Sequence, residues 1–175
     1  MKENDVRETA PQLWQPLHEE FRFTLDVAAD ERNALCERFC TQFGTCYEPG
    51  TDLHDWDERD GLLYPWEGES VWCNPPFSDI YPWICKAWGE FRSARSIVML
   101  VPANRTEQAW WQKGVAPFVK ANEFSVRWPA KRQHFLVNGE PCWKRDKAGE
   151  LILTKKGKKQ RSSPKFACAL VIWRP

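Results

Sequence analysis

Hydrophobic and polar residues follow the pattern of a layered α/β protein. Residues 96–102 form a continuous apolar run, which is typical of a buried strand in a parallel sheet. Residues 21–27 and 69–73 are shorter apolar segments and predict two further strands. Additional strands are predicted at residues 36–43, 118–126 and 166–173. Helical patterns lie between several of these segments, so the sequence favours the α/β class.

Helices are predicted where apolar residues recur three or four positions apart. Pro11 suits the first position of a helix that we expect to end near Glu20. Residues 80–91 predict a second helix with one apolar face. Asp30 is expected to cap a helix that continues beyond Asn33, and Thr106 to cap another. The polar residues 1–10 are expected to be frayed.

The segment Val71-Trp72-Cys73-Asn74-Pro75-Pro76-Phe77 has the clearest chemical potential. Prolines donate no N–H, so the predicted strand must end just after Asn74. Open α/β sheets bind ligands at the carboxyl ends of their strands. At that end Asn74 offers a side-chain carbonyl, Cys73 and Pro75 offer backbone carbonyls, and Phe77 offers a flat ring.

This set of groups suits methylation of an exocyclic amine on a nucleobase. The lone pair of such an amine is delocalised into the ring, which makes it a poor nucleophile. Two carbonyl acceptors can hold both N–H bonds, aim the lone pair at a methyl donor and stabilise the developing positive charge. A base inside a duplex must first be flipped out, and Phe77 can stack on it. The same residues also fit a Pro-Pro strand end with an Asn cap and no chemistry.

Composition and charge limit the number of domains and the kind of nucleic-acid surface that the protein can have. The chain has 175 residues, of which 42% are hydrophobic and 28% charged, as expected for one globular domain. Its net charge of +1 gives no global signature for nucleic acid, so any phosphate-binding surface must be local. The eleven tryptophans serve either as core or as stacking surface.

The seven cysteines are an odd number, and we see no signal peptide or transmembrane run. We therefore expect buried thiols without disulfides and a cytoplasmic location. An alternative zinc set of Cys36, Cys40, Cys46 and His54 lacks the paired C-x2-C spacing, so we predict no metal.

Two loops carry further candidate groups. Residues 44–68 form a long predicted loop with five acidic residues between Asp52 and Asp60, which fits either cofactor contact or a solvated acidic loop. Residues 144–165 form a basic insertion. Its densest part consists of Lys155, Lys156, Lys158, Lys159 and Arg161. This insertion is either a solvated charge run or an arm that contacts phosphates.

The order of these segments resembles the phage-type DNA N6-adenine methyltransferases, a small Dam-like family. Pro11-Gln12-Leu13-Trp14 is similar to the amino-terminal cofactor motif, with Ala10 between Thr9 and Pro11. Leu25-Asp26-x-Ala28-Ala29-Asp30 followed by Asn33 is similar to the cofactor loop. Asp60-Gly61-Leu62 with Trp66 resembles a third family segment, with Pro65 where an Asp is usual. Asn74-Pro75-Pro76-Phe77 resembles the catalytic motif.

The resemblance implies a class I methyltransferase fold, Rossmann-like, with a mostly parallel seven-stranded sheet and an antiparallel final strand pair. It implies a single domain over residues 1–175 and S-adenosylmethionine as methyl donor. The residues that it assigns to the cofactor are Pro11, Trp14, Asp26, Ala28, Ala29, Asp30, Asn33 and Asp60.

The implied substrate is double-stranded DNA with a flipped adenine. Arg132-x-x-Phe135 resembles a late motif of the family, with Lys131 in place of a glycine. The residues that we expect to contact DNA are Lys131, Arg132 and His134, together with those of the basic insertion. Two alternatives remain open from the sequence. One is methylation of RNA or of a protein glutamine, and the other is a non-catalytic nucleic-acid-binding relative of the fold.

Overall fold

The computed structural model of the protein describes residues 7–41, 46–47, 60–160, 162 and 166–175. A mixed sheet of seven strands has the order β4-β3-β2-β5-β6-β10-β7. Its strands are β2 (Leu25–Ala29), β3 (Arg38–Thr41), β4 (Cys46–Tyr47), β5 (Ser70–Cys73), β6 (Ser96–Pro102), β7 (Phe124–Arg127) and β10 (Cys168–Trp173). A smaller sheet contains β1 (Glu8–Thr9), β8 (Phe135–Val137) and β9 (Glu140–Pro141).

The strand directions confirm the α/β class and correct one detail. Strands β3, β2, β5 and β6 are parallel, whereas β4 runs antiparallel to β3. Strand β10 is antiparallel to both β6 and β7, as expected for the final pair. Antiparallel pairs are therefore as frequent as parallel pairs in the described sheet, because each side of the parallel centre carries a reversed strand.

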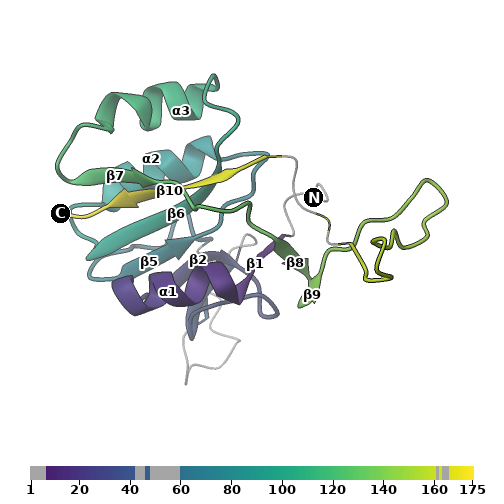
Figure 1. Ribbon diagram of the computed structural model, residues 1–175. Coiled ribbons are helices and arrows are strands. Elements are labelled where there is room, and N and C mark those ends of the chain that lie inside the picture. Colours follow the sequence, from purple (N-terminus) through teal and green to yellow (C-terminus); the bar gives the residue numbers. More distant parts are fainter. Residues whose placement is uncertain (1–6, 42–45, 48–59, 161, 163–165) are drawn as a thin grey trace.

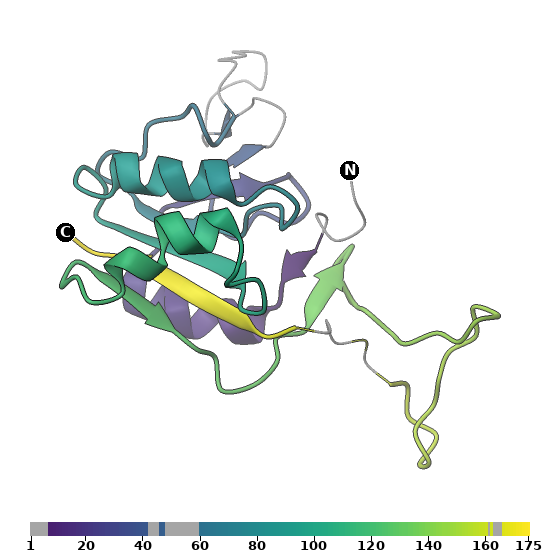
Figure 2. The same ribbon diagram turned by 90° about the horizontal axis from the view of Figure 1, so that it is seen from above.

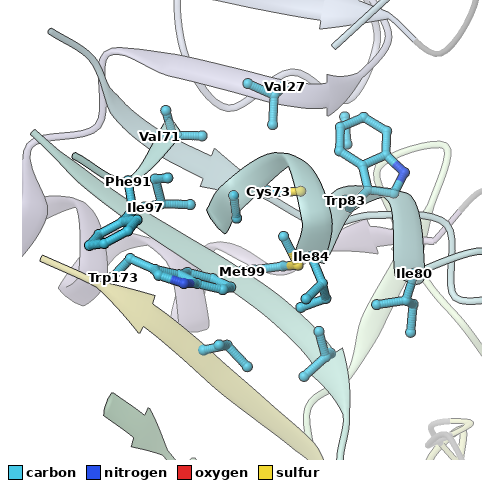
Figure 3. Close-up of a cluster of buried hydrophobic side chains, with 14 of the residues drawn as sticks. Val27, Val71, Cys73, Ile80, Trp83, Ile84, Phe91, Ile97, Met99 and Trp173 are labelled. Atoms are coloured by element: carbon cyan, nitrogen blue, oxygen red, sulfur yellow. The ribbon is translucent and has the colours of Figure 1, made fainter. Parts of the chain in front are cut away.

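Helices cover both faces of the large sheet (Figure 1). Helix α1 (Pro11–Phe21) lies on one face, and α2 (Tyr81–Glu90) and α3 (Ala109–Gly114) lie on the other. A short 3-10 turn, η2 (Ala116–Phe118), follows α3. Between α2 and the sheet, the side chains of Val71, Ile84 and Met99 belong to one buried cluster (Figure 3). Between α1 and the other face of the sheet, a second cluster contains Leu17, Phe23 and Trp72. Burial of these side chains is the main stabilising contribution to the layered fold.

Several element boundaries differ from the expectations. Helix α1 continues through Phe21 and ends at Arg22, whose φ of 53° is left-handed, so the following strand begins only at Leu25. Residues 31–33 form a turn instead of the expected helix. Helix α3 has Gln108 at its N-cap and no side-chain cap, so Thr106 does not cap it. Residues 8–9 were expected to be frayed, but they pair with β8.

The carboxyl ends of the parallel strands meet the smaller sheet and the basic insertion. Figures 1 and 2 show β8, β9 and the long loop that follows them beside this edge, with the loop extending away from the body. The loop folds back on itself through hydrogen bonds among three segments, since Lys144 N–H donates to Gln160, Gln160 to Ile152, and Ile152 to Lys144. We call residues 142–160 the basic arm.

The expectation that all cysteines are free is wrong. Cys40 is disulfide-bonded, and its Cα partner across the antiparallel β3–β4 ladder is Cys46. Cys40 is therefore not a zinc ligand, and His54 lies outside the described residues. None of the helices in the described ranges is long and apolar enough to cross a membrane.

Candidate active site

The site is built at the point where the order of the parallel strands reverses. Strand β2 lies between β3, which follows it in the chain, and β5, which pairs with it through Leu25–Val71 and Asp26–Trp72. From β2 the chain continues to β3 on one side, whereas from β5 it continues to β6 on the other side. A crevice at the carboxyl ends of such strands is the usual ligand site of an open α/β sheet. Asn74 follows β5 directly at this edge.

Asn74 is held in one orientation by the backbone of the amino-terminal segment. It is half-buried, and its Nδ2 donates a hydrogen bond of 2.9 Å to the carbonyl oxygen of Arg7. Among the described residues no group donates to its Oδ1. The following Pro75 is buried, which fixes the exit of the chain from the sheet. The side chain therefore presents a carbonyl acceptor at the edge.

Phe77 is half-buried and contacts other aromatic rings. Its ring centroid lies 5.9 Å from that of Phe135 and 5.8 Å from that of Phe166, with interplanar angles of 84° and 61°. Edge-to-face contacts of this kind are favourable and fix ring orientation. Phe77, Phe135 and Phe166 thus form an aromatic cluster beside Asn74, contributed by three separate parts of the chain.

Asp26 points into the protein. Only 3% of the residue is exposed, and burial raises the pKa of its carboxyl to about 7. Its Oδ2 accepts a hydrogen bond of 3.1 Å from the N–H of Leu35, and Oδ1 a longer one of 3.4 Å from Ala28. The carboxyl therefore fastens the β2–β3 connection to β2. The adjacent Ala28 and Ala29 are buried at the strand end.

Asp30 and Asn33 stabilise the turn that leaves β2. Asn33 Oδ1 accepts from the N–H of Asp30 at 2.8 Å, and Asp30 Oδ1 accepts from Arg32 at 2.8 Å. These local hydrogen bonds compete with helix formation, which explains the absence of the expected helix in residues 30–37. The turn lies at the carboxyl end of β2, where the cofactor loop was expected.

The segment that begins at Asp60 packs directly on β2. A Cβ on Gly61 would lie 1.9 Å from the carbonyl oxygen of Val27, so only glycine permits this approach. Asp60 Oδ1 accepts from the N–H groups of Leu62 and Leu63 at 2.8 and 3.0 Å. The fully buried Trp66 donates from Nε1 to Gly61 at 3.0 Å. The structure thus brings Asp60 to the edge that contains β2 and Asn74.

Pro11 and Trp14 belong to the same helix but contact different parts of the protein. Pro11 lines a pocket of about 240 Å³ between the start of α1 and the β8–β9 hairpin, and His134 lines the same pocket. Asn74, Asp26 and Asp60 are not among its lining residues. Trp14 instead stacks on His18 with ring centroids 4.3 Å apart and packs against the cluster under α1. Its Nε1 is buried and has no hydrogen-bond partner in the part of the chain that the structure describes.

The expected DNA-contacting residues lie at the same edge of the sheet. Lys131 and Arg132 are exposed on the connection from β7 to β8, and His134 is half-buried there. The four described lysines of the insertion, Lys155, Lys156, Lys158 and Lys159, are exposed on the basic arm. Arg161 lies outside the described residues. Between residues 144 and 160 the chain has seven basic and two acidic side chains.

Sequence reasoning missed three residues of this edge. Arg7 acts through its backbone carbonyl, which no side-chain pattern reveals. Glu8 accepts a hydrogen bond of 2.9 Å from the N–H of Gly139 and so joins β1 to the β8–β9 turn. Trp128 is 58% exposed, directly after β7. An aromatic residue shortly before Lys131 and Arg132 was the one available signal for this third residue.

Trp128 and Asn74 both follow strands that end at the same edge of the large sheet. Cys73, Met99, Val171 and Val126 form one row across β5, β6, β10 and β7. Asn74 follows the first residue of that row, and Trp128 comes two positions after the last. Since the two strands are three positions apart in the sheet, about 14 Å separates them.

Comparison with known proteins places the chain in a family. The family model described as DNA N-6-adenine-methyltransferase (Dam) matches residues 1–175. A DNA N-6-adenine-methyltransferase of Escherichia phage T1 is 32% identical over 92 residues, which cover 51% of this chain and 32% of the phage protein. The match thus spans about a third of that relative's length. Because the family model covers the chain throughout, the chain belongs to the DNA N-6-adenine-methyltransferase (Dam) family.

Proposed function

We propose that this protein transfers a methyl group from S-adenosylmethionine to N6 of an adenine flipped out of double-stranded DNA. The observation that carries the proposal is the amide of Asn74, which is fixed by Arg7 with its oxygen left as an acceptor at the carboxyl end of β5. Membership in the Dam family supports the reaction type. The proposed class I methyltransferase fold is supported by the strand order and by the antiparallel β10 between β6 and β7.

Asn74 and its neighbours would act on the target amine. The Asn74 Oδ1 and the backbone carbonyl of Pro75 are the acceptors that we assign to the two N–H bonds of the adenine amine. Accepting both bonds directs the nitrogen lone pair and stabilises positive charge on nitrogen during transfer. Phe77 provides the ring against which the base would stack, supported from behind by Phe135 and Phe166.

The residues around the crevice fit a nucleoside cofactor. Ala28 and Ala29 are small residues at the end of β2, which would permit the close approach of a ligand, and the Gly61 backbone lies against Val27. Asp60 and Asp30 begin the two turns that flank this position. We assign S-adenosylmethionine to this crevice, where it would supply a methyl group activated by its positively charged sulfur. Asp26 would support the crevice from below by holding the β2–β3 connection.

The same edge offers a surface for the DNA backbone. The basic arm extends from the body beside the smaller sheet (Figure 2), and its lysines are exposed. Lysines on such an arm neutralise phosphates without reading sequence. Lys131, Arg132 and His134 lie on the connection from β7 to β8, where we expect base contacts. A DNA substrate also implies action in the cytoplasm of the host cell.

A transfer assay tests the proposal and its main alternative. The protein is incubated with S-adenosylmethionine that carries a labelled methyl group and with purified duplex DNA, RNA or protein in separate reactions. Label in N6-methyladenine of the duplex is expected, and it should disappear with Asn74→Ala. Label in RNA or in protein glutamine alone would replace DNA as substrate. Cofactor binding without any transfer would identify a non-catalytic relative.

A further inference from the structure

The hydrogen bond between Asn74 and Arg7 belongs to a chain of contacts that continues into the smaller sheet. Arg7 directly precedes β1, whose residues Glu8 and Thr9 pair with Leu136 and Phe135 of β8. The Glu8 carboxylate accepts from Gly139 N–H in the β8–β9 turn. Two contacts, one along the backbone and one through a side chain, therefore fix where the Arg7 carbonyl lies.

Phe135 connects this small sheet to the catalytic motif a second time. It is 3% exposed, it pairs with Thr9, and its ring meets that of Phe77. The paired strands β1 and β8 thus contact the motif at two places. The carbonyl of Arg7, just before β1, accepts from Asn74, and the ring of Phe135 in β8 contacts the ring of Phe77. A local shift of β1 would therefore alter the orientation of the Asn74 side chain without displacing the β5 strand that precedes it.

The two ends of an asparagine amide differ in chemistry but hardly in shape. Either end could face outward if the surroundings did not discriminate between them. A backbone carbonyl only accepts hydrogen bonds, so it pairs with the NH2 end and repels the oxygen. At 2.9 Å the Arg7 carbonyl therefore holds the NH2 end of Asn74, so the oxygen is the end that faces away from Arg7.

We infer that the Arg7 carbonyl selects the catalytic orientation of the Asn74 amide, and that Glu8 is the positioning residue that keeps this carbonyl in place. The inference rests on the proposed function, because it concerns how the proposed acceptor is aimed. It also predicts how a carboxyl group at position 74 would behave in this protein. A carboxylate there would place two acceptors against each other, unless the carboxyl carries a proton and donates as the amide does.

Asn74→Asp tests this requirement through pH. A protonated carboxyl reproduces the donor and acceptor pattern of the amide, whereas an ionised one does not. Single-turnover methylation by the variant should therefore fall about tenfold for each pH unit above the pKa of the new carboxyl. The parent, measured over the same range, corrects for all other titrations. A variant that is as fast as the parent at pH 8 would overturn the inference.

The charged and titratable groups around position 74 come from three parts of the chain. The positive charge of Arg7 lowers the pKa of the Cys168 thiol, and it would also lower the pKa of a new carboxyl at position 74. The negative charge of Asp26 raises the pKa of the Cys73 thiol, and it would also raise the pKa of the new carboxyl. His134 lies on the connection that leads into β8. Glu8 lies on β1. A comparison that changes only Glu8 keeps the other three groups constant.

A carbon-13 titration of the introduced carboxyl gives a readout that needs no activity. With Glu8 present, its pKa should lie roughly one unit or more above the ordinary value of about 3.9. Adding Glu8→Ala should lower the pKa of this carboxyl toward the ordinary value, because without the bond to Gly139 the Arg7 carbonyl is no longer held against position 74. Adding Glu8→Gln, which keeps an acceptor for Gly139 N–H, should leave it raised. An ordinary pKa with Glu8 present, or equal values in all three proteins, would overturn the inference.

The two experiments separate this inference from the proposed function. Glu8→Ala in the otherwise unchanged protein should slow methyl transfer several-fold with cofactor affinity unchanged, and Glu8→Gln should restore the rate. A parent that methylates no DNA would refute the proposed function, and the titration would still decide whether Arg7 orients position 74. An active parent whose rate is insensitive to Glu8→Ala would reject Glu8 as a positioning residue.

Discussion

Gly61 lies so close to Val27 that a Cβ at position 61 would come within 1.9 Å of the Val27 carbonyl oxygen. The contact presses the segment after Asp60 onto the end of β2, and the hydrogen bond from Trp66 to Gly61 holds it there. The cofactor crevice that we propose therefore depends on a contact between two backbones, with no side chain between them.

Gly61→Ala should consequently destabilise the protein and weaken cofactor binding together. The new methyl group meets backbone on one side and the Trp83 ring on the other, so the segment must move. Overpacking of this kind typically lowers the free energy of unfolding by about 1–3 kcal/mol. Gly89→Ala is the matched control, because nothing lies within 4 Å of its Cβ position in α2. That variant should be neutral or slightly more stable. Equal stability of both variants in urea would contradict the close contact.

Asp26 should make the protein less stable as the pH rises. Its pKa is about 7 in the folded state and near 3.8 when unfolded, so the folded state binds more protons between these values. This contribution to stability is therefore fully present below pH 4, falls as the pH rises from 4 to about 7, and is lost above the folded pKa. The cost of ionisation is on the order of 4 kcal/mol at most.

Asp26→Asn isolates this effect. The amide oxygen can still accept from Leu35 N–H, but the side chain carries no charge at any pH. The difference in unfolding free energy between variant and parent should change in favour of the variant from pH 5 to pH 8. Urea unfolding at both pH values measures it, and other titrating groups cancel in the difference. A difference that is constant with pH would show that Asp26 is already ionised at pH 5.

The basic arm should contribute to DNA affinity through phosphates. Replacing Lys155, Lys156, Lys158 and Lys159 with Ser removes four exposed charges. The slope of log affinity against log salt should flatten by up to about 0.9 for each phosphate that the arm no longer neutralises, with the sequence preference retained. Single-turnover transfer at saturating DNA should be unchanged.

Charge removal elsewhere is the control for the arm. Lys120 and Arg95 are exposed near the amino-terminal ends of β7 and β6, at the opposite edge of the sheet. Replacing both with Ser should leave the salt slope as in the parent. If the arm variant matches the parent as well, the arm is a solvated charge run. A changed pattern of methylated sites would instead mean that the arm reads bases.

The central fold was predictable because its signals are local. The apolar runs of β5, β6 and β10 and the helices α1 and α2 were expected at nearly their observed positions. Strand β1 was missed, because its two residues are strand only through pairing with β8, more than 120 positions away. The helix after Asp30 was wrongly expected, because Asp30 and Asn33 satisfy the backbone of a turn instead.

The candidate site was predictable in part for the same reason. The Asn74-Pro75 strand end carries its chemistry in its own side chains, and the sequence shows it directly. The orientation of Asn74 depends on a backbone carbonyl of Arg7, 67 positions earlier, which no residue pattern encodes. Likewise, Asp26 was expected to face a cofactor, but its burial and its bond to Leu35 depend on how the following connection folds back.

The most direct test of the account is methyl transfer to duplex DNA by the parent and by Asn74→Ala, with calorimetric binding of S-adenosylmethionine measured on both proteins. Removing one acceptor for the developing charge should slow transfer about 10²–10³-fold, or roughly 3 kcal/mol or more. Cofactor affinity should be unchanged, because Asn74 is assigned to the target amine and the crevice residues to the donor. Near-parent turnover by a folded Asn74→Ala protein would contradict the assignment of the active site.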